Sequence, residues 1–426
     1  MNNIKEVKLK INKERIKQNI LKLGEIGLSS EGGVNRSLAS QADIDSREWI
    51  KEYWQKNIVK EITTDVGANL WGEYPYSNEK ELAPIIIGSH NDSVPEGGKY
   101  DGALGVLLAT EVTQTLVENK LVLRHPLKII SLTGEEPNPY QISTLGSKII
   151  SGVVNQDYLK KFNHIETHEA LSEAIDRLGG DFKHIDENTL APNSFAAFLE
   201  CHIEQGRRLF ESNEPVAIVS GITGIYRELI VLRGEANHAG TTDLKHRKDA
   251  LLAMSWINLE LRKFLSEFEQ SEPVVGTIGF AEVKPNAANI IPGEVRFNVD
   301  VRSGNWEKVQ QTIKFLDQCF MKLKEKGLKL NREKILNQKP AKLNEKIVNA
   351  LEQTIEQDFG YQPQKMTSMA GHDAANLAKI GRAGMLFVKS IDGKSHCKEE
   401  YSRIEDIEIA GNVLLNAILK LDKELD

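Results

Sequence analysis

The sequence predicts an α/β fold with a mostly parallel central sheet flanked by helices, into which a smaller α/β domain with an antiparallel sheet is inserted. Short, continuously apolar runs such as residues 84–87 are typical of strands buried on both faces of a parallel sheet. Apolar residues at helical spacing follow, as at Leu104, Leu107 and Leu108. After about residue 215 the strands alternate instead, as in 226–233, which indicates a sheet with one exposed face.

Length and composition narrow the class of protein further. A chain of 426 residues is long for one ordinary domain, so we expect two. The net charge of -7 comes without a basic block, which argues against a nucleic-acid partner, and no apolar stretch approaches the ~20 residues of a membrane span. The charged start, residues 1–8, does not resemble a signal peptide. The odd number and wide spacing of Cys201, Cys319 and Cys397 argue against a disulfide framework, and we expect a cytoplasmic protein.

The elements follow from the same patterns, taken in order. The part before the insertion has predicted helices at 9–27, from Asp45, from Leu104 and over much of 146–180, with strands at 59–64, 69–74, 84–87, 127–133 and 194–200. The predicted inserted domain, 216–332, has strands at 226–233, 274–280 and 296–302 and helices at 247–268 and 306–326. A helix at 343–358 and a continuously apolar strand at 384–388 then resemble the elements before the insertion. The predicted domains are therefore 1–215 with 333–426, and 216–332 between them.

The buried strands share one feature, which is that metal-capable side chains come just past their predicted C-terminal ends. These side chains are His90 and Asp101, Glu135 and Glu136, His202, and His396. Because parallel strands end at the same edge of a sheet, where open α/β folds bind their ligands, we expect these groups to converge. Each residue taken alone is more often an ordinary polar side chain, so the argument rests on their joint occurrence at four strand ends.

This set of side chains has a definite chemistry. Two imidazoles with a carboxylate suit a borderline divalent ion such as zinc or manganese, and there are enough ligands for two ions with Asp101 shared. A bridged pair of ions generates hydroxide at neutral pH and polarises a carbonyl. One of the paired glutamates is then free to act as general base. The spacing predicts a dinuclear metallohydrolase. Five other histidines, His125, His164, His168, His184 and His246, are interpreted as surface residues, and Cys201 and Cys397 as packing residues.

The same residues carry a resemblance to a known family. Eight segments occur in that family's order: 88–95, 97–106, Glu135-Glu136, 202–206, 238–242, 285–293, 370–374, and Ser395-His396 followed by 399–401. The chain resembles, over nearly its whole length, the N-carbamoyl-L-amino-acid hydrolase, β-ureidopropionase and allantoate amidohydrolase family. That family belongs to a clan of dinuclear aminoacylases and carboxypeptidases. The resemblance implies a metallopeptidase-like catalytic domain and an inserted lid that carries the interface of a homodimer.

The resemblance also implies a role for individual residues. It implies two divalent ions, Zn²⁺ or Mn²⁺ with Co²⁺ or Ni²⁺ as alternatives, one held by His90, Asp101 and His202 and the other by Asp101, Glu136 and His396. Glu135 corresponds to the general base and Asp92 to the acid that orients the imidazole of His90. His238 corresponds to a lid histidine that stabilises the oxyanion from the partner subunit. The remaining substrate-binding residues implied are Gln205, Asn289, Arg302, Gly371 and His372.

The motifs limit the range of possible substrates but do not identify one. Many members of the clan use a carboxylate where this chain has His202, whereas the carbamoyl branch uses His within His-Ile-Glu-Gln-Gly. The chain departs from the commonest pattern at 137–140, which read Pro-Asn-Pro-Tyr, and at Asp243, where Pro is usual. We expect hydrolysis of an N-carbamoyl-L-amino acid. The alternatives are allantoate or ureidoglycolate, an N-acyl amino acid or dipeptide, and a non-catalytic relative that binds a small acid.

Overall fold

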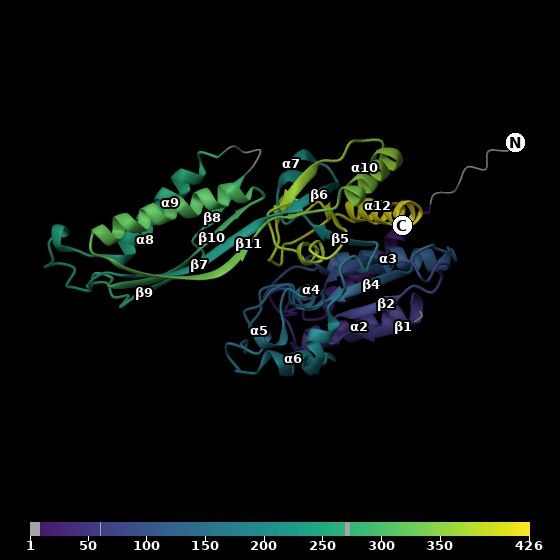
Figure 1. The fold of residues 1–426 in the computed structure, drawn as a ribbon, viewed down its shortest axis with the longest axis horizontal. Coiled ribbons are helices and arrows are strands. Elements are labelled where there is room, and N and C mark those ends of the chain that lie inside the picture. Colours follow the sequence, from purple (N-terminus) through teal and green to yellow (C-terminus); the bar gives the residue numbers. More distant parts are fainter. Residues whose placement is uncertain (1–8, 60, 269–272) are drawn as a thin grey trace. The chain divides into compact units, whose positions relative to one another are not determined.

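The computed structural model describes residues 9–59, 61–268 and 273–426, which form two compact units (Figure 1). The first unit contains the chain up to Ser220 together with Lys342–Met366 and Ala370–Asp426. The second contains Gly221–Ala341 and Thr367–Met369, compared with the predicted insertion at 216–332. Residues 1–8, on which the prediction about a signal peptide rests, lie outside the described part of the chain. Within that part, no helix combines the length and apolar character needed to cross a bilayer.

The larger sheet has nine strands within the described residues, and its path runs β1-β2-β4-β3-β5-β14-β6-β12, with β13 paired to β6. The four central strands, β4, β3, β5 and β14, are parallel, and antiparallel neighbours flank them. The strands are β1 (Glu61–Thr64), β2 (Leu70–Glu73), β3 (Ile85–His90), β4 (Leu127–Leu132), β5 (Ala197–Ile203), β6 (Val216–Ile222), β12 (Ala341–Lys342), β13 (Lys365–Ser368) and β14 (Ala383–Val388).

Continuous burial explains why the central strands are so apolar. Every residue of β3, β5 and β14 is buried, as expected for parallel strands covered on both faces. The mostly parallel central sheet is therefore confirmed. The strands run further than predicted, because His90 is the last residue of β3 and His202 is the penultimate residue of β5 rather than lying beyond the strand ends.

The helices of the first unit are α1 (Lys13–Glu25), α2 (Gln41–Asn57), α3 (Ala103–Glu118), α4 (Leu145–Ile150), α5 (Gln156–Leu159), α6 (Leu171–Arg177), α7 (Arg208–Ser212), α10 (Glu345–Phe359), α11 (Ala374–Leu377) and α12 (Ile404–Glu424), with 3-10 turns η1 (Phe182–Asn188) and η3 (Ile391–Gly393). Helix α3 follows β3 and packs against β3 and β5, and its residues 103–116 are all buried. Helix α2 begins earlier than the predicted Asp45, because the hydroxyl of Ser40 accepts a hydrogen bond from the backbone N–H of Asp43 and caps the helix there.

The prediction of mostly helical structure over 146–180 is wrong. The segment holds only α4 without its first residue and the short helices α5 and α6, with turns between them. Gly152 and Gly179, both with positive φ, lie in these turns. The apolar spacing instead packs the short helices onto a common buried cluster, whose members include Tyr140, Leu145, Leu159 and Leu171.

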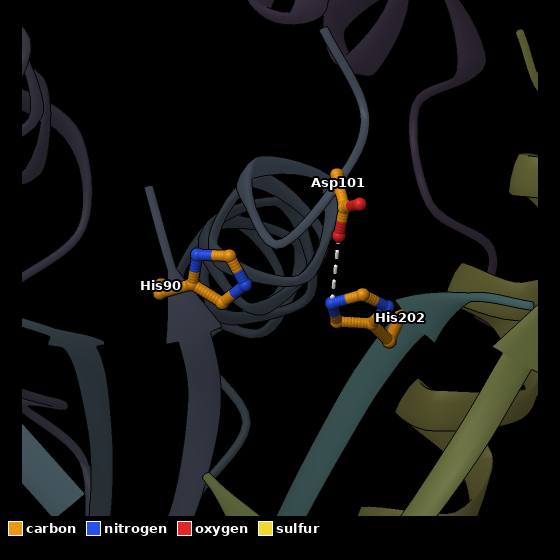
Figure 2. A group of neighbouring side chains, drawn as sticks. All are labelled: His90, Asp101 and His202. Atoms are coloured by element: carbon orange, nitrogen blue, oxygen red, sulfur yellow. Dashed lines mark ion pairs between the residues drawn. The ribbon is translucent and has the colours of Figure 1, made fainter. Parts of the chain in front are cut away.

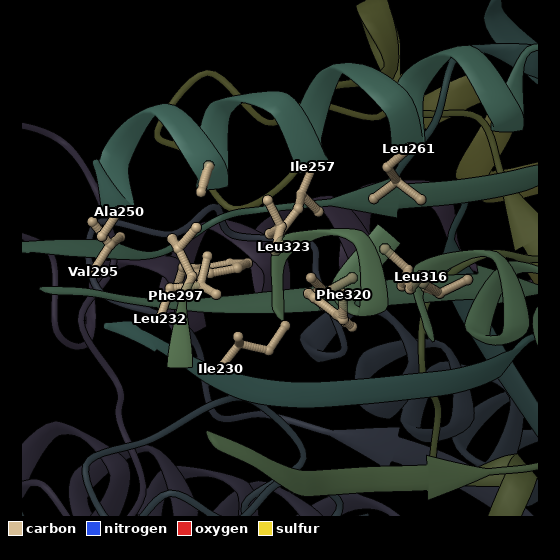
Figure 3. Close-up of a cluster of buried hydrophobic side chains, with 14 of the residues drawn as sticks. Ile230, Leu232, Ala250, Ile257, Leu261, Val295, Phe297, Leu316, Phe320 and Leu323 are labelled. Carbon is tan, nitrogen blue, oxygen red and sulfur yellow. The ribbon is translucent and has the colours of Figure 1, made fainter. Parts of the chain in front are cut away.

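The second unit is an antiparallel sheet covered on one face by two helices. The strand order is β11-β7-β10-β8, with β9 also paired to β10, and every pairing is antiparallel as predicted. The elements are β7 (Gly224–Arg233), η2 (Leu244–His246), α8 (Ala250–Leu265), β8 (Val274–Thr277), β9 (Ala281–Lys284), β10 (Glu294–Ser303), α9 (Trp306–Glu325) and β11 (Lys329–Gln338). The alternating residues of β7 and β10 pack with α8 and α9 into one apolar core, which includes Ile230, Ile257, Phe297, Leu316 and Phe320 (Figure 3).

Candidate metal centre

The first donor group is formed where β3 and β5 end. His90 closes β3, His202 lies near the end of the neighbouring parallel strand β5, and Asp101 lies in the loop just before α3. Figure 2 shows the three side chains facing one another across the sheet edge. Their donor atoms all lie within 4.8 Å of one another, and all three residues are buried. Asp101 Oδ1 is 3.1 Å from His202 Nε2.

Hydrogen bonds on the far side of each ring orient both imidazoles. His90 Nδ1 donates to the backbone carbonyl of Asp92 at 3.2 Å, and His202 Nδ1 donates to the carbonyl of Ile203 at 2.9 Å. With the proton on Nδ1, each ring presents the lone pair of Nε2 to the centre of the group. This is the arrangement by which backbone carbonyls commonly orient a metal-binding histidine.

A second donor group shares Asp101 with the first. His396 Nε2 lies 3.3 Å from Asp101 Oδ2 and 3.3 Å from Glu136 Oε1. The neighbouring carboxylates of Asp101 and Glu136 raise the pKa of His396 to about 11, although burial acts to lower it. Because an imidazole must be neutral to bind a metal, loading of this group would release a proton. Asp101 is thus the one residue common to both groups.

The donor atoms fit a divalent cation. His90 Nε2, Asp101 Oδ1 and Glu136 Oε1 are buried and have no hydrogen-bond partner in the described part of the chain. A buried polar atom without a partner costs about 1–3 kcal/mol, so three around one centre need an explanation. Nitrogen and carboxylate oxygen donors of this kind suit zinc or manganese. The predicted metal ligands are therefore brought together in a set that a cation would satisfy.

Asp92 ties the His90 loop to the glutamate loop. Its two carboxylate oxygens accept the backbone N–H groups of Glu135 at 3.1 Å and Glu136 at 3.0 Å. Its Oδ1 also lies 3.4 Å from His90 Nδ1. One buried carboxylate therefore contacts both the imidazole that we predicted it to orient and the backbone of the two glutamates.

Glu135 has the setting of a base beside this centre. Its Oε2 lies 3.7 Å from His90 Nε2, and the side chain is almost fully buried. Burial raises the pKa of Glu135 well above its usual range, and the carboxylates of Glu136 and Asp373 raise it further against the opposing charge of His90. A carboxyl group with a raised pKa is suited to accepting and returning a proton near neutral pH.

Sequence reasoning missed Ser395, Glu400 and Glu200, which contact Asp101 or its neighbours. Gln205, expected at the substrate, donates from Nε2 to Asp101 Oδ2 at 2.8 Å, and Ser395 Oγ donates to the same oxygen at 2.6 Å. Glu400 accepts the backbone N–H of Asp101 at 3.0 Å. Burial raises the pKa of Glu400 to about 7. The sequence offered only a weak signal, the Glu-Glu-Tyr that follows His396, with nothing to indicate which glutamate is buried.

Glu200 is the third missed residue, and it belongs to a further group with His202 and His372. The donor atoms of these three lie within 4.8 Å of one another, and the His372 ring packs against the His202 ring with centroids 4.5 Å apart. Burial and the neighbouring His202 lower the pKa of His372 well below its usual range. Both oxygens of Glu200 are occupied, because Oε1 accepts from Ser89 Oγ and Oε2 from the N–H of Ala374. Hydrogen bonds from Ser89 and Ala374 therefore hold Glu200 in place beside His202, a predicted metal ligand. Gly371 directly precedes His372 in this loop.

The remaining predicted residues lie in the second unit. His238 is exposed, and its Nδ1 accepts the backbone N–H groups of Gly240 at 3.0 Å and Thr241 at 3.2 Å. This places the proton on Nε2. The carbonyl of Asn289 accepts the N–H of Ala239 at 2.9 Å, so His238 and Asn289 lie on adjoining segments.

Arg302 is held in a defined position within the same unit. Its Nε donates to Asp300 Oδ1 at 2.7 Å and its Nη1 to the carbonyl of Met369 at 3.2 Å. Arg227 donates to the other oxygen of Asp300, at 2.8 Å from Nε. Two guanidinium groups therefore share one carboxylate, which leaves a net positive charge beside Arg302.

The structure tests two further predictions, the exposure of His125 and the absence of disulfides. His125 is fully buried, with ring nitrogens 2.8 Å from the carbonyl of Ala83 and 3.2 Å from that of Leu425, so its interpretation as a surface residue is wrong. It lies just before the buried strand β4, where the chain enters the core. All three cysteines are free, as expected without a disulfide framework.

The unusual residues 137–140 form a turn that is tied back onto itself. The side chain of Asn138 accepts the N–H of Tyr140 at 3.0 Å and donates to the carbonyl of Ile142 at 2.6 Å. Tyr140 is buried, and its hydroxyl donates to Glu169 at 2.6 Å. Residues 137–140, which depart from the common pattern, therefore place Tyr140 in the buried apolar cluster. They present no charged side chain next to Glu136.

Replacing Gly102 with alanine is expected to damage the first donor group. The residue has φ +62°, and a Cβ there would lie 2.1 Å from Cε1 of His90. We expect Gly102→Ala to weaken metal binding at least about 10-fold, as other changes to ligand orientation do. Titration calorimetry with Mn²⁺ on chelator-stripped protein measures this.

Gly32→Ala is the matched control for that substitution. Gly32 also has a positive φ, +93°, but a Cβ there would meet nothing within 4 Å. Both variants therefore carry the strain of a left-handed backbone, and only Gly102→Ala displaces an imidazole. Equal metal affinity in the two variants would contradict the proposed contact.

Most of the chain is similar in sequence to known proteins. The sequence profile of peptidase family M20/M25/M40 matches residues 86–420. An N-carbamoyl-L-amino acid amidohydrolase of Geobacillus stearothermophilus is 32% identical over 413 residues, covering 96% of this chain and 98% of the relative. An allantoate amidohydrolase of Bacillus subtilis is 32% identical over 406 residues, covering 94% of this chain and 95% of the relative.

A solved structure matches both units of the fold. The crystal structure of an amidase of the hydantoinase/carbamoylase family from Burkholderia multivorans superposes with a TM-score of 0.86 at 29% identity. The match covers 97% of this chain and 98% of that structure. The chain is thus similar in fold to a known amidase over nearly its whole length.

Proposed function

The chain belongs to peptidase family M20/M25/M40, and from that premise we propose that it hydrolyses an N-carbamoyl-L-amino acid. One water is consumed, and the products are the L-amino acid, carbon dioxide and ammonia. The relatives are amidohydrolases of C–N bonds in linear amides, and this chain is one of them. The observation that carries the proposal is the pair of donor groups sharing Asp101, with the carboxylate of Glu135 beside them.

We propose that the centre holds two divalent ions, Zn²⁺ or Mn²⁺, with Co²⁺ or Ni²⁺ as alternatives. One is held by His90, Asp101 and His202, and the other by Asp101, Glu136 and His396. Bound there, such ions lower the pKa of water and polarise the substrate carbonyl. Glu135 accepts the proton of the attacking water and returns it to the leaving nitrogen. The orphaned donor atoms and the orientation of both imidazoles support this assignment.

We propose that the second unit supplies the remaining contacts to the substrate. His238 donates from Nε2 to the oxyanion, and its tautomer supports that role because Nδ1 is already occupied by backbone N–H groups. Arg302 and Asn289 bind the substrate carboxylate, and the fixed guanidinium of Arg302 is suited to a bidentate contact. Within the first unit, Gln205, Gly371 and His372 complete the proposed binding residues. The free state of all three cysteines supports a cytoplasmic location.

We propose that the protein is a homodimer joined through the second unit, and that His238 acts on the partner's substrate. Helix α8 exposes two large apolar side chains one heptad apart, Leu252 at 67% and Leu259 at 69%. Replacing both with glutamate is expected to halve the mass in solution to that of one chain, 47.7 kDa, and to abolish most activity. Light scattering after gel filtration gives the mass.

Leu21→Glu is the control for the double variant. Leu21 is 50% exposed but lies on α1 of the first unit. It is expected to leave both the mass and the activity unchanged. A double variant that becomes monomeric and keeps full activity would contradict the action of His238 across the dimer.

The experiment that tests the function is ammonia release from a substrate panel. The protein is reconstituted with Mn²⁺ or Zn²⁺ and given several N-carbamoyl-L-amino acids, N-carbamoyl-β-alanine, allantoate and ureidoglycolate. N-acetyl amino acids and dipeptides are followed by free amine. Ammonia and the free amino acid in equal amounts, abolished by chelator, support the proposal.

The other outcomes of that panel separate the rival functions. Ammonia from allantoate instead favours the second candidate, which the equally similar allantoate amidohydrolase of Bacillus subtilis supports. Free amine without ammonia would move the protein to the aminoacylase or peptidase side of the family. No product from any substrate by the metal-loaded protein would favour a binding role.

A further inference from the structure

Glu400 reaches the metal centre from the far end of the chain. Its Oε1 accepts two consecutive backbone N–H groups, those of Tyr100 at 2.9 Å and Asp101 at 3.0 Å. Glu400 is buried, and about 300 residues of chain separate it from the loop that it contacts. A carboxylate that accepts two adjacent N–H groups fixes the backbone direction at that point. The backbone that carries Asp101 is therefore held by a group from outside its own loop.

Ser395 contacts the side chain of Asp101, whereas Glu400 contacts its backbone. Its hydroxyl lies 2.6 Å from Asp101 Oδ2 and 3.3 Å from Glu400 Oε2. Gln205 Nε2 also donates to Asp101 Oδ2, at 2.8 Å. Two neutral donors thus occupy one oxygen of Asp101, whereas the other, Oδ1, has no hydrogen-bond partner among the described residues and lies 3.1 Å from His202 Nε2. The side-chain rotation of Asp101 is determined by these contacts.

The surrounding backbone is shaped to admit the Glu400 carboxylate. A Cβ at position 98 would lie 2.1 Å from Glu400 Oε1, so only glycine leaves room for it there. The Glu400 N–H itself donates to the carbonyl of Cys397 at 3.1 Å, which closes a turn directly after His396. The same turn therefore carries a predicted metal ligand, His396, and the group that holds the shared ligand, Asp101.

We propose that Glu400 and Ser395 are positioning residues that set the backbone and the side chain of Asp101 for metal binding. The proposal rests on the metal centre of the proposed function but not on the identity of the substrate. Groups that orient a metal ligand contribute about 10–100-fold to metal affinity. Because Asp101 belongs to both donor groups, loss of its orientation is expected to weaken both.

The test measures Mn²⁺ affinity by titration calorimetry on chelator-stripped protein, without substrate. Ser395→Ala and Glu400→Gln are expected to weaken Mn²⁺ binding about 10–100-fold. Ser395→Thr keeps the hydroxyl and is expected to restore most of the affinity. Glu399→Gln, at the exposed neighbouring glutamate, is the control and is expected to bind as the wild type does. Thermal unfolding of each stripped variant reports any loss of structure.

Two results would overturn the proposal. The first is Mn²⁺ affinity within about threefold of the wild type for both Ser395→Ala and Glu400→Gln, well short of the loss that a positioning group causes. The second is equally weak binding by Ser395→Ala and Ser395→Thr, because then the hydroxyl does not matter. If Glu400→Gln unfolds, the two serine variants decide the matter. An inactive wild type that still shows these affinity differences would refute the proposed substrate and leave the positioning role supported.

Discussion

Glu135→Gln is expected to lower kcat by about 10³-fold while metal content and fold are retained, because general-base catalysis contributes on the order of 10²–10⁴-fold. The side chain makes no hydrogen bond within the described residues that glutamine would lose, and its Oε2 lies 3.7 Å from His90 Nε2. Glutamine keeps the shape but cannot accept the proton of water. The loss is therefore expected in the chemical step.

The measurement for Glu135→Gln combines steady-state kinetics with metal analysis. We expect KM to change little relative to kcat, since the residue is assigned no part in holding the substrate. Glu399→Gln, with an exposed carboxylate, is the control that keeps its activity. A Glu135→Gln protein with wild-type kcat and full metal content would remove Glu135 from the role of base.

Asp101→Asn is expected to have the second large effect, the loss of both ions together. Burial acts to raise the pKa of Asp101, but the imidazoles of His202, His396 and His90 outweigh it and hold the pKa well below its usual range. The residue is therefore an anion among three imidazoles. The variant removes this negative charge. We therefore expect metal affinity to fall by more than about 100-fold, which is the upper end of the loss caused by removing a group that only orients a ligand.

Metal content after dialysis checks this second prediction. The wild type is expected to retain two ions per chain and Asp101→Asn fewer than one, with activity lost in parallel. Asp157→Asn, at an 86% exposed side chain on α5, is the control for the loss of one negative charge. Retention of both ions by Asp101→Asn would show that Asp101 is not the shared ligand.

The fold class and the place of the candidate metal centre follow from local patterns. The continuous apolar runs of β3, β4, β5 and β14 predicted buried parallel strands, and the alternation in β7 and β10 predicted the second sheet. Where one apolar pattern is compatible with two different local structures, the prediction was less accurate. The apolar spacing of 146–180 suits a long helix as well as it suits short helices packed on one cluster, and only the turns at Gly152 and Gly179 distinguish the two.

The sequence alone predicted which side chains gather at the candidate metal centre, because parallel strands end at one edge of the sheet. His90, Glu136 and His202 could therefore be grouped before any contact was known. Only the tertiary structure decided how they are held. The contacts of Glu400 and Ser395 with Asp101 join residues almost 300 positions apart, and the two oxygens of Glu200 accept hydrogen bonds from Ser89 and Ala374. Such contacts have no local period, because they depend on where distant segments pack and not on the spacing of neighbouring residues.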